Sequence, residues 1–346
     1  MALVSLVARR VGVFAVSLLG ATVVVFFVAE ALPGDVAEAM LGLGATPEAL
    51  EALRHDWGLD RPAVIRYASW LGGLLHGDLG ASYLTGRPAA AEIGPPLAVT
   101  CWLVGLALPL AVLAALPAGL LAALWRRRWR GTALSFLSQL GMAVPVFFTA
   151  IVLVVVFAVR LGWLPAVGYA DLVTPAGLNA AEWARHLVLP VTALAVVQAS
   201  LLARYVRSAF VEVLTEDYLR TARAVGWTRW RALLRHGARN AALSVVTVVG
   251  LQLGAMLVGA ILVEAVFGLP GLGSFLLQKV ANRDILVVQG VVILLVAVVL
   301  AVNLAVDLVY VALDPRLRQQ GASRQSGRRL SADKAGRAGS GPGSHW

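Results

Sequence analysis

Six segments without Asp, Glu, Lys or Arg constrain this chain more than any other feature. They span residues 11–29, 93–125, 131–159, 186–203, 240–263 and 285–306. Each is long enough for a helix to cross a bilayer, which takes roughly 17–25 residues. Backbone groups in hydrocarbon must pair within their own structure, and none of the segments alternates as a barrel strand does. We therefore expect an all-α integral membrane protein with six transmembrane helices.

The composition excludes an ordinary water-soluble enzyme. Only 14% of the 346 residues are charged, whereas soluble proteins carry about 25%. The formal net charge of +10 comes largely from the tail after Pro315, which holds seven basic residues and one acid. Arginine-rich cytoplasmic loops account for the remainder, so we expect no nucleic-acid partner. The single cysteine, Cys101, lies in an apolar segment and is expected to be an inert core residue.

Arginines in the short connections predict the orientation, because basic residues mark the cytoplasmic side. Four arginines follow the second apolar segment and eight lie within residues 204–239, whereas the two neighbouring connections carry two basic residues each. Both termini, residues 1–10 and 316–346, are therefore expected in the cytoplasm, and the Gly, Ser and Arg content of the tail predicts disorder. The predicted transmembrane helices are 11–31, 97–124, 132–159, 187–206, 243–266 and 285–312.

Residues 32–96 form the longest predicted extracellular or periplasmic segment. Thr46 is a suitable N-cap and Pro47 a suitable first helical residue, so a short amphipathic helix is expected over 47–57. A second is expected over 63–75. The segment either packs as a cap over the bundle or docks an extracellular partner, and the sequence leaves both interpretations open.

The cytoplasmic segment 207–242 contains two helical patterns that meet at Gly226. Thr215 is placed to cap the first pattern and Thr228 the second, and a glycine between them supplies the positive φ that ends a helix. The pattern predicts a helix, turn and helix that project from the bundle. The alternative is a basic amphipathic pair that rests on anionic headgroups.

Several motifs in the sequence resemble those of a known family. Residues 217–226 read Asp-Tyr-Leu-Arg-Thr-Ala-Arg-Ala-Val-Gly, and residues 236–241 read His-Gly-Ala-Arg-Asn-Ala. Further matching stretches are 33–35, 58–62, 77–82, 161–165, 264–273 and 313–316. Together they resemble ABC-importer permeases of the dipeptide, oligopeptide and nickel group, with a core over about 93–314. The long segment after the first helix resembles the first of the two permease subunits in such systems.

The resemblance implies a type I ABC-importer permease bundle in the bacterial cytoplasmic membrane. It implies a second permease subunit, cytoplasmic ATPases and an extracellular or periplasmic substrate-binding protein as partners. The chain has no Gly-x-x-x-x-Gly-Lys-Ser/Thr loop, so we expect it to bind no cofactor, to be no enzyme itself, and to rely on ATP used by its partners. The residues implied to couple to the ATPase are Thr221, Ala222, Arg223, Ala224 and Gly226.

Peptides are the expected cargo, with nickel chelates, glutathione or haem as alternatives that the sequence leaves open. A proton-driven secondary transporter is the rival class, but it would need an acidic or histidine relay at midspan, which the charge-free segments lack. The five histidines are scattered, without cysteine or carboxylate partners at ligand spacing, so no metal site is predicted.

Polar residues inside the predicted spans are candidates for function. Gln139, Gln198, Gln252 and Asn303 lie near midspan, where they either line the substrate pathway or form interhelical hydrogen bonds. Glu264, with Pro270 and Gly271, is expected to anchor a loop at the outer gate. Asp307 is expected to have a structural role near the inner end of the last helix. Residues 250–254, Gly-Leu-Gln-Leu-Gly, are expected to allow close helix packing.

Overall fold

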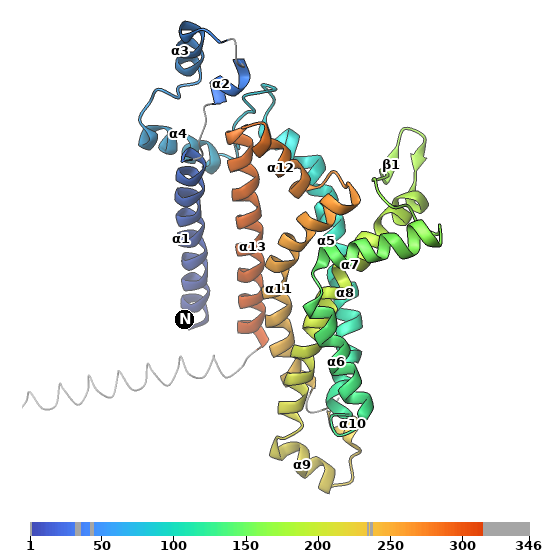
Figure 1. Cartoon of the computed structure of the whole chain (residues 1–346). Coiled ribbons are helices and arrows are strands. Elements are labelled where there is room, and N and C mark those ends of the chain that lie inside the picture. Colours follow the sequence, from blue (N-terminus) through green and yellow to red (C-terminus); the bar gives the residue numbers. More distant parts are fainter. Residues whose placement is uncertain (1, 32–35, 42–44, 234, 236–237, 314–346) are drawn as a thin grey trace, which may run out of the picture.

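The computed structural model describes residues 2–31, 36–41, 45–233, 235 and 238–313, and almost all of its ordered elements are helices (Figure 1). The elements at the N-terminal side are α1 (Ala2–Glu30), α2 (Val36–Leu41), α3 (Pro47–Asp56), α4 (Ala63–Leu75) and α5 (Ala89–Leu124). The middle of the chain forms α6 (Trp129–Ala143), α7 (Val146–Leu153), the π-helical η2 (Val154–Arg160), β1 (Val173–Thr174), β2 (Gly177–Leu178) and α8 (Ala180–Val213). The remaining elements are α9 (Asp217–Ala224), α10 (Arg229–Ala232), α11 (Ala238–Phe267), α12 (Leu272–Ala281) and α13 (Ile285–Leu313).

Five of the described helices are long and apolar enough to cross a bilayer, and a sixth span results if one bent pair counts as a single crossing. The five segments are Val7–Glu30, Ala89–Leu124, Ala180–Val213, Val245–Phe267 and Ile285–Val309. The expected all-α membrane bundle is therefore confirmed.

The predicted continuous helix over 132–159 is wrong. The structure divides it into α6 and the pair α7 and η2, with a bend of 99°. The break falls at Pro145, which has no N–H to continue the ladder, and at Val144, which is extended with φ −83° and ψ 123°. A residue before proline avoids the helical region for steric reasons, so the sequence itself carried the signal.

Several helices run past the charge-free segments that predicted them. α5 begins at Ala89 rather than 97, and α8 extends over Ala180–Val213 rather than 187–206. Because α8 ends at Val213 and α11 begins at Ala238, part of the predicted cytoplasmic segment 207–242 is helix continuous with the spans. Charged residues mark where an apolar segment ends but not where the helix ends, because the backbone hydrogen bonds of a helix continue into water.

Two ends of the bundle can be distinguished. The beginning of α1 and the end of α13 lie at the same end as α9 and α10, and we call this the α9 end (Figure 1). The helices α2, α3, α4 and α12 lie at the opposite end, the α12 end (Figure 1). The predicted disordered tail, 316–346, lies outside the described residues.

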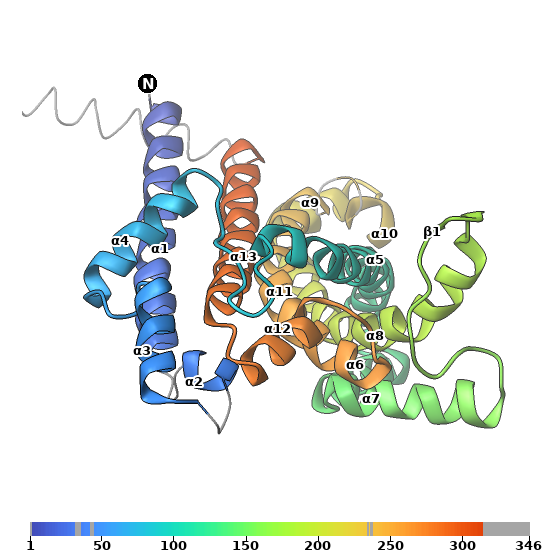
Figure 2. The same cartoon turned by 90° about the horizontal axis from the view of Figure 1, so that it is seen from above.

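The N-terminal helices α1 to α4 occupy one flank beside α13, whereas α6, α7 and the β1–β2 hairpin occupy the other (Figure 2). β1 and β2 pair antiparallel, with Val173 opposite Leu178. α1 meets α13 through an ion pair between Arg10 Nη1 and Asp307 Oδ2 at 2.5 Å. Toward the α12 end, Phe26 of α1, Trp70 of α4 and Ile293 of α13 form a small apolar cluster.

The main core lies where α5 and α8 pack together, joined by residues of α7 and α11. Small residues permit this approach: a Cβ added at Gly119 would lie 2.6 Å from the carbonyl oxygen of Ala203. Gly250 packs in the same way against Val306 of α13, where an added Cβ would lie 2.2 Å from Cγ2. The expected close packing at 250–254 is therefore present at Gly250. Cys101, expected in the core, is exposed on α5.

Candidate functional site

A buried carboxylate holds the first turn of α12. Glu264 near the end of α11 is fully buried, and its Oε2 accepts from the backbone N–H of Gly273 at 2.7 Å and of Ser274 at 3.4 Å. Its Oε1 accepts from the hydroxyl of Thr100 on α5 at 2.5 Å. The same hydroxyl accepts from the backbone N–H of Leu272 at 2.8 Å. Glu264 thus pairs the free N–H groups at the N-terminus of α12, where a negative charge is also favoured by the helix dipole.

Two glycines allow the close approach of α12 to α11, Gly271 in the loop before α12 and Gly273 in its first turn. A Cβ added at Gly271 would lie 2.2 Å from the carboxyl carbon of Glu264, and one at Gly273 would lie 2.7 Å from the Ile261 backbone. Pro270, the third residue predicted for this loop, is exposed. The structure therefore brings Glu264 and Gly271 into contact and leaves Pro270 at the surface.

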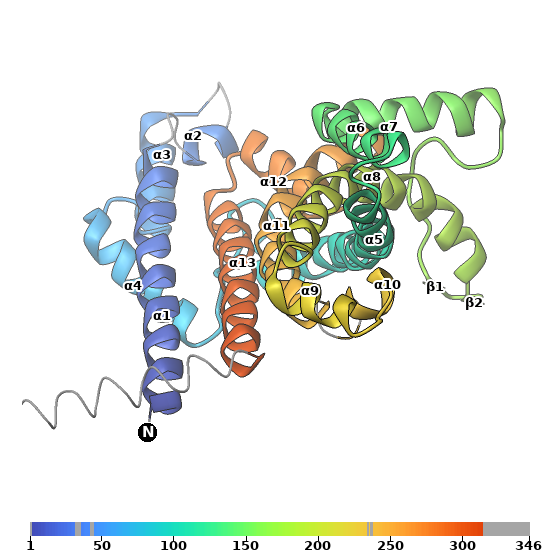
Figure 3. The same cartoon turned by 90° about the horizontal axis from the view of Figure 1, so that it is seen from below.

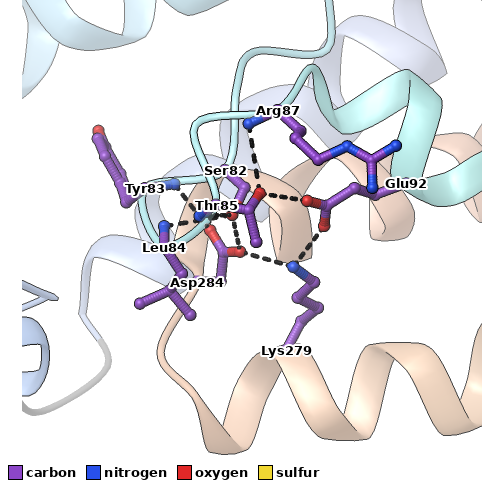
Figure 4. A network of polar contacts seen from close by, with 8 residues as sticks. All are labelled: Ser82, Tyr83, Leu84, Thr85, Arg87, Glu92, Lys279 and Asp284. Atoms are coloured by element: carbon purple, nitrogen blue, oxygen red, sulfur yellow. Dashed lines mark hydrogen bonds and ion pairs between the residues drawn. The ribbon is translucent and has the colours of Figure 1, made fainter.

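The other end of α12 is held by a polar network (Figure 4). Lys279 Nζ donates to Glu92 Oε2 at 2.5 Å and to Asp284 Oδ2 at 2.9 Å. Asp284 also accepts from the hydroxyl of Ser82 at 2.6 Å and from the backbone N–H of Tyr83 at 3.3 Å. The network joins the end of α12, the start of α5 and the loop that ends the N-terminal segment.

Lys279 lies between a buried carboxylate, Asp284, and a largely covered one, Glu92. The side chains of Lys279 and Glu92 are 9% exposed and that of Asp284 is 0% exposed. Burial alone would lower the pKa of Lys279, but the hydrogen bonds and charges of Glu92 and Asp284 outweigh it, so the pKa lies above its ordinary value. Only two of the 29 basic residues are lysines, 279 and 334. A compact ammonium with three donors suits this enclosed position better than a planar guanidinium.

At the α9 end, two short helices lie beneath the ends of the long ones (Figure 3). Leu219 of α9, with Ala232 and Leu233, is buried in a cluster with Val206 and Phe210 of α8. Thr228 caps α10 by accepting from the backbone N–H of Arg231 at 3.4 Å, as the sequence predicts. The hydroxyl of Thr215 instead donates back to the carbonyl oxygen of Glu212 at 2.6 Å.

The turn between these helices contains the predicted coupling residues. Gly226 has φ +98°, as expected for the residue that ends α9, and a Cβ added there would meet no heavy atom within 4 Å. Thr221, Ala224 and Gly226 are exposed and Ala222 is half-buried. The side chain of Arg223 is outside the described residues. The buried face of α9 fixes its position, and the opposite face with the turn is left open.

The four midspan polar residues lie on four different helices and differ in exposure. Gln198 of α8 is buried, Gln252 of α11 and Asn303 of α13 are half-buried, and Gln139 of α6 is exposed. None of them lines the cavity of about 500 Å³ that lies between α5, α8, α11 and α13. Its walls are apolar, and include Val112, Phe210, Val249 and Val306.

The contacts described above are mechanical links between helices. Within the described part of the chain, no three His, Cys, Asp or Glu residues lie close enough to hold a metal ion. These contacts fix α12 at both ends. Its first turn is held to α5 and α11, and its last turn is held to α5 and the N-terminal segment.

Sequence reasoning missed most partners in these contacts. Thr100 gave no signal, since a single threonine in an apolar segment is commonplace. Glu92, Lys279 and Asp284 each lie at or near the edge of an apolar segment. Charged residues that flank predicted spans on one side of a membrane were the available clue.

Comparison with known proteins identifies the class. Residues 115–319 match the family described as "Binding-protein-dependent transport system inner membrane component". Residues 3–90 match "Binding-prot-dependent transport system membrane comp, N-term". The chain belongs to this family, and is a multi-pass membrane permease of the ABC-importer type.

Individual relatives extend along nearly the whole chain. A peptide transport system permease protein of Brucella abortus (strain 2308) is 39% identical over 315 residues, covering 91% of this chain and 99% of the relative. The glutathione transport system permease protein GsiC of Escherichia coli (strain K12) is 39% identical over 297 residues, covering 86% and 93%. Among solved structures, the MetNI methionine ABC transporter has a chain with a TM-score of 0.54 at 18% identity, covering 64% of this chain and 96% of that one. This last likeness supports the fold alone.

Proposed function

We propose that this chain is the first of two permease subunits in an ATP-driven importer of peptides. The observation that carries the proposal is the 39% identity to a peptide transport permease over 91% of this chain. The equal identity to a glutathione permease keeps a small thiol peptide within the proposed substrate class. The sister permease would supply the other half of the pathway.

In the proposed mechanism the chain itself binds no nucleotide, and ATP is hydrolysed by partner subunits at the α9 end. α9 is seated on α8 through Leu219, while the face with Thr221, Ala224 and Gly226 is exposed. A rigid helix held on one side and open on the other can transmit a push from an ATPase into α8. We propose this orientation, with both chain ends in the cytoplasm of a bacterium and the network at Lys279 outside.

The same proposal gives α12 the role of an outer gate. Glu264 and Thr100 join its first turn to α11 and α5, so the loop and the helix move with the spans that carry them. The segment from α2 to α4 then stands where an external substrate-binding protein would dock. Gln198, Gln252 and Asn303 remain proposed pathway residues, and Gln139, which is exposed on α6, is proposed to face the sister subunit.

Transport by vesicles containing the full complex tests the proposal. We expect uptake of a labelled dipeptide that needs ATP and the binding protein, and that persists when a protonophore collapses the pH gradient. Glutathione, a nickel chelate and haem serve as competing cargo and define the substrate. Uptake driven by an imposed pH gradient without nucleotide would instead assign the protein to the proton-driven secondary transporters.

A further inference from the structure

The turn between α5 and α6 carries the densest group of basic residues in the described part of the chain. Residues 125–130 read Trp-Arg-Arg-Arg-Trp-Arg, and no Asp or Glu occurs between residues 93 and 170. The turn lies at the α9 end, because Ala123 near the end of α5 packs in the same cluster as Leu219 of α9. Four positive charges therefore lie together where α5 ends and α6 begins.

These arginines have no carboxylate partners. Three of the four are exposed, namely Arg127, Arg128 and Arg130. Among the described residues, none of the four forms an ion pair. The turn that carries them is tight, since a Cβ added at Gly131 would lie 2.3 Å from the carbonyl oxygen of Trp125. An unpaired positive patch held in one place favours an anionic partner.

An apolar stripe continues from this turn along α6. Trp129, Phe136 and Leu140 are seven and four positions apart, which places them on one face of the helix. Their exposed fractions are 75%, 58% and 47%. The guanidinium carbon of Arg130 lies 5.8 Å from the centre of the Trp129 ring, so the basic patch and the stripe meet there. Gln139, proposed to face the sister subunit, lies about a quarter-turn around the helix from this stripe.

A basic turn followed by an exposed apolar face matches the chemistry of an anionic phospholipid. Arginine pairs well with phosphate, and tryptophan is enriched at the headgroup level of a bilayer. A soluble acidic protein would pair with the arginines but would leave Phe136 and Leu140 uncovered. We infer that the α5–α6 turn binds the headgroup of an anionic phospholipid from the leaflet at the α9 end, with the acyl chains along α6.

A lipid titration tests the inference. Phosphatidylglycerol is added to the delipidated, purified full-length protein in detergent micelles, and the melting temperature is followed. Phosphatidylcholine, which has no net charge, and inorganic phosphate, which has no acyl chains, are the comparison probes. Because a ligand of the folded state raises the melting temperature, we expect saturable stabilisation by phosphatidylglycerol and little by either comparison probe. Equal stabilisation by phosphatidylcholine or by phosphate would overturn the inference.

Variants locate the effect. Arg127→Gln and Arg128→Gln each remove one charge from an exposed position, so the protein should fold normally. Half-maximal stabilisation should then need about fivefold more phosphatidylglycerol. Arg160→Gln is the matched control, because Arg160 is also exposed but lies at the end of η2, beyond the bend after α6. An equal response in these three variants would overturn the inference.

The alternative occupant is an acidic surface of a partner subunit, and copurification separates the two. If the arginines bound the ATPase instead, Arg128→Gln would retain less ATPase while its response to phosphatidylglycerol stayed normal, and this result would also overturn the inference. The lipid titration uses neither nucleotide nor cargo. Its outcome is therefore independent of whether the protein transports peptides.

Discussion

Thr100 and Glu264 meet across 164 positions of sequence, and the Thr100 hydroxyl both donates to the carboxylate and accepts from the first N–H of α12. One hydroxyl therefore connects three helices, α5, α11 and α12. Because Glu264 is fully buried, its charge depends on these few donors. Any movement of α12 that breaks them would leave a buried carboxylate unpaired, so the gate helix and its neighbours are expected to move as one body.

Replacing Thr100 tests this connection. Thr100→Val keeps the shape but removes one donor to Glu264 and one acceptor for Leu272, which should cost about 3 kcal/mol. A lowered melting temperature of the purified protein would be the readout. Thr149→Val is the control, since that hydroxyl donates to the carbonyl of Pro145, the N-cap of α7, at 3.4 Å and links no second helix. Equal melting temperatures for the two variants would contradict the role of Thr100.

Gly271 should tolerate no side chain. In Gly271→Ala the new Cβ would lie 2.2 Å from the Glu264 carboxyl group, so the loop before α12 must shift and the cap is lost. We expect reduced transport and a lower melting temperature. Gly254→Ala is the matched control, because its Cβ would meet Val299 at an ordinary 3.5 Å. If Gly271→Ala behaved like Gly254→Ala, the loop would not depend on this contact.

The Lys279 network predicts how stability responds to alkali. The folded-state pKa of Lys279 is raised by Glu92 and Asp284, so its stabilising contribution is fully present below the ordinary lysine value of about 10.4 and is lost as pH rises through the higher folded-state value. Melting temperatures measured from pH 7 upward should therefore fall only beyond about pH 10 for this contact.

A variant separates this contribution from other groups that titrate in alkali. Lys279→Met leaves the buried carboxylate of Asp284 without its cation and should cost about 3 kcal/mol at neutral pH. The variant should also lose less stability in alkali, because it lacks the contribution that deprotonation of Lys279 removes. A Lys279→Met protein as stable as the unmodified one at pH 7 would show that the network contributes little.

Cysteine labelling tests the orientation. A cysteine at Ser208, exposed on α8 near the α9 end, should react with impermeant thiol reagents only in opened cells. A cysteine at Ala49, exposed on α3, should react in intact cells once any outer barrier is removed. Cys101 is exposed on α5 and must first be replaced, for example by alanine. The reverse labelling pattern would invert the proposed topology.

The sequence predicted the parts of the fold that depend on local composition. Charge-free segments predicted the spans, and Thr46 and Pro47 predicted the start of α3. A glycine between two helical patterns predicted the positive φ of Gly226. Pro145 carried a local signal too, and the break at that residue follows from its missing N–H.

The contacts that define the site could not be predicted in this way. Lys279 and Glu92 are 187 positions apart, and nothing in either local sequence specifies the other. Glu264 was identifiable as a candidate because a carboxylate near a span is costly, but its partner Thr100 became visible only when α5 and α11 were packed. Distant pairing depends on the tertiary arrangement, whereas helix existence depends on the local pattern.

The coupling proposal makes the last prediction, and it rests on Gly226. Its φ of +98° is strained for a branched residue, yet an added side chain would point into open space. Gly226→Val should therefore cost only about 1–2 kcal/mol of local strain and leave the bundle inserted, while altering the turn that presents α9. If this turn docks on the ATPase, the variant should retain less ATPase during purification and transport less.

A matched control variant shows whether backbone strain alone reduces ATPase retention. Gly177 in the β1–β2 hairpin also has positive φ, +116°, and also has open space around an added Cβ, but the hairpin lies toward the α12 end, away from α9 (Figure 1). Gly177→Val should thus keep normal ATPase retention at the same expression level. Normal retention and transport by Gly226→Val would refute coupling through this turn, and would favour a basic helix pair that rests on the membrane surface.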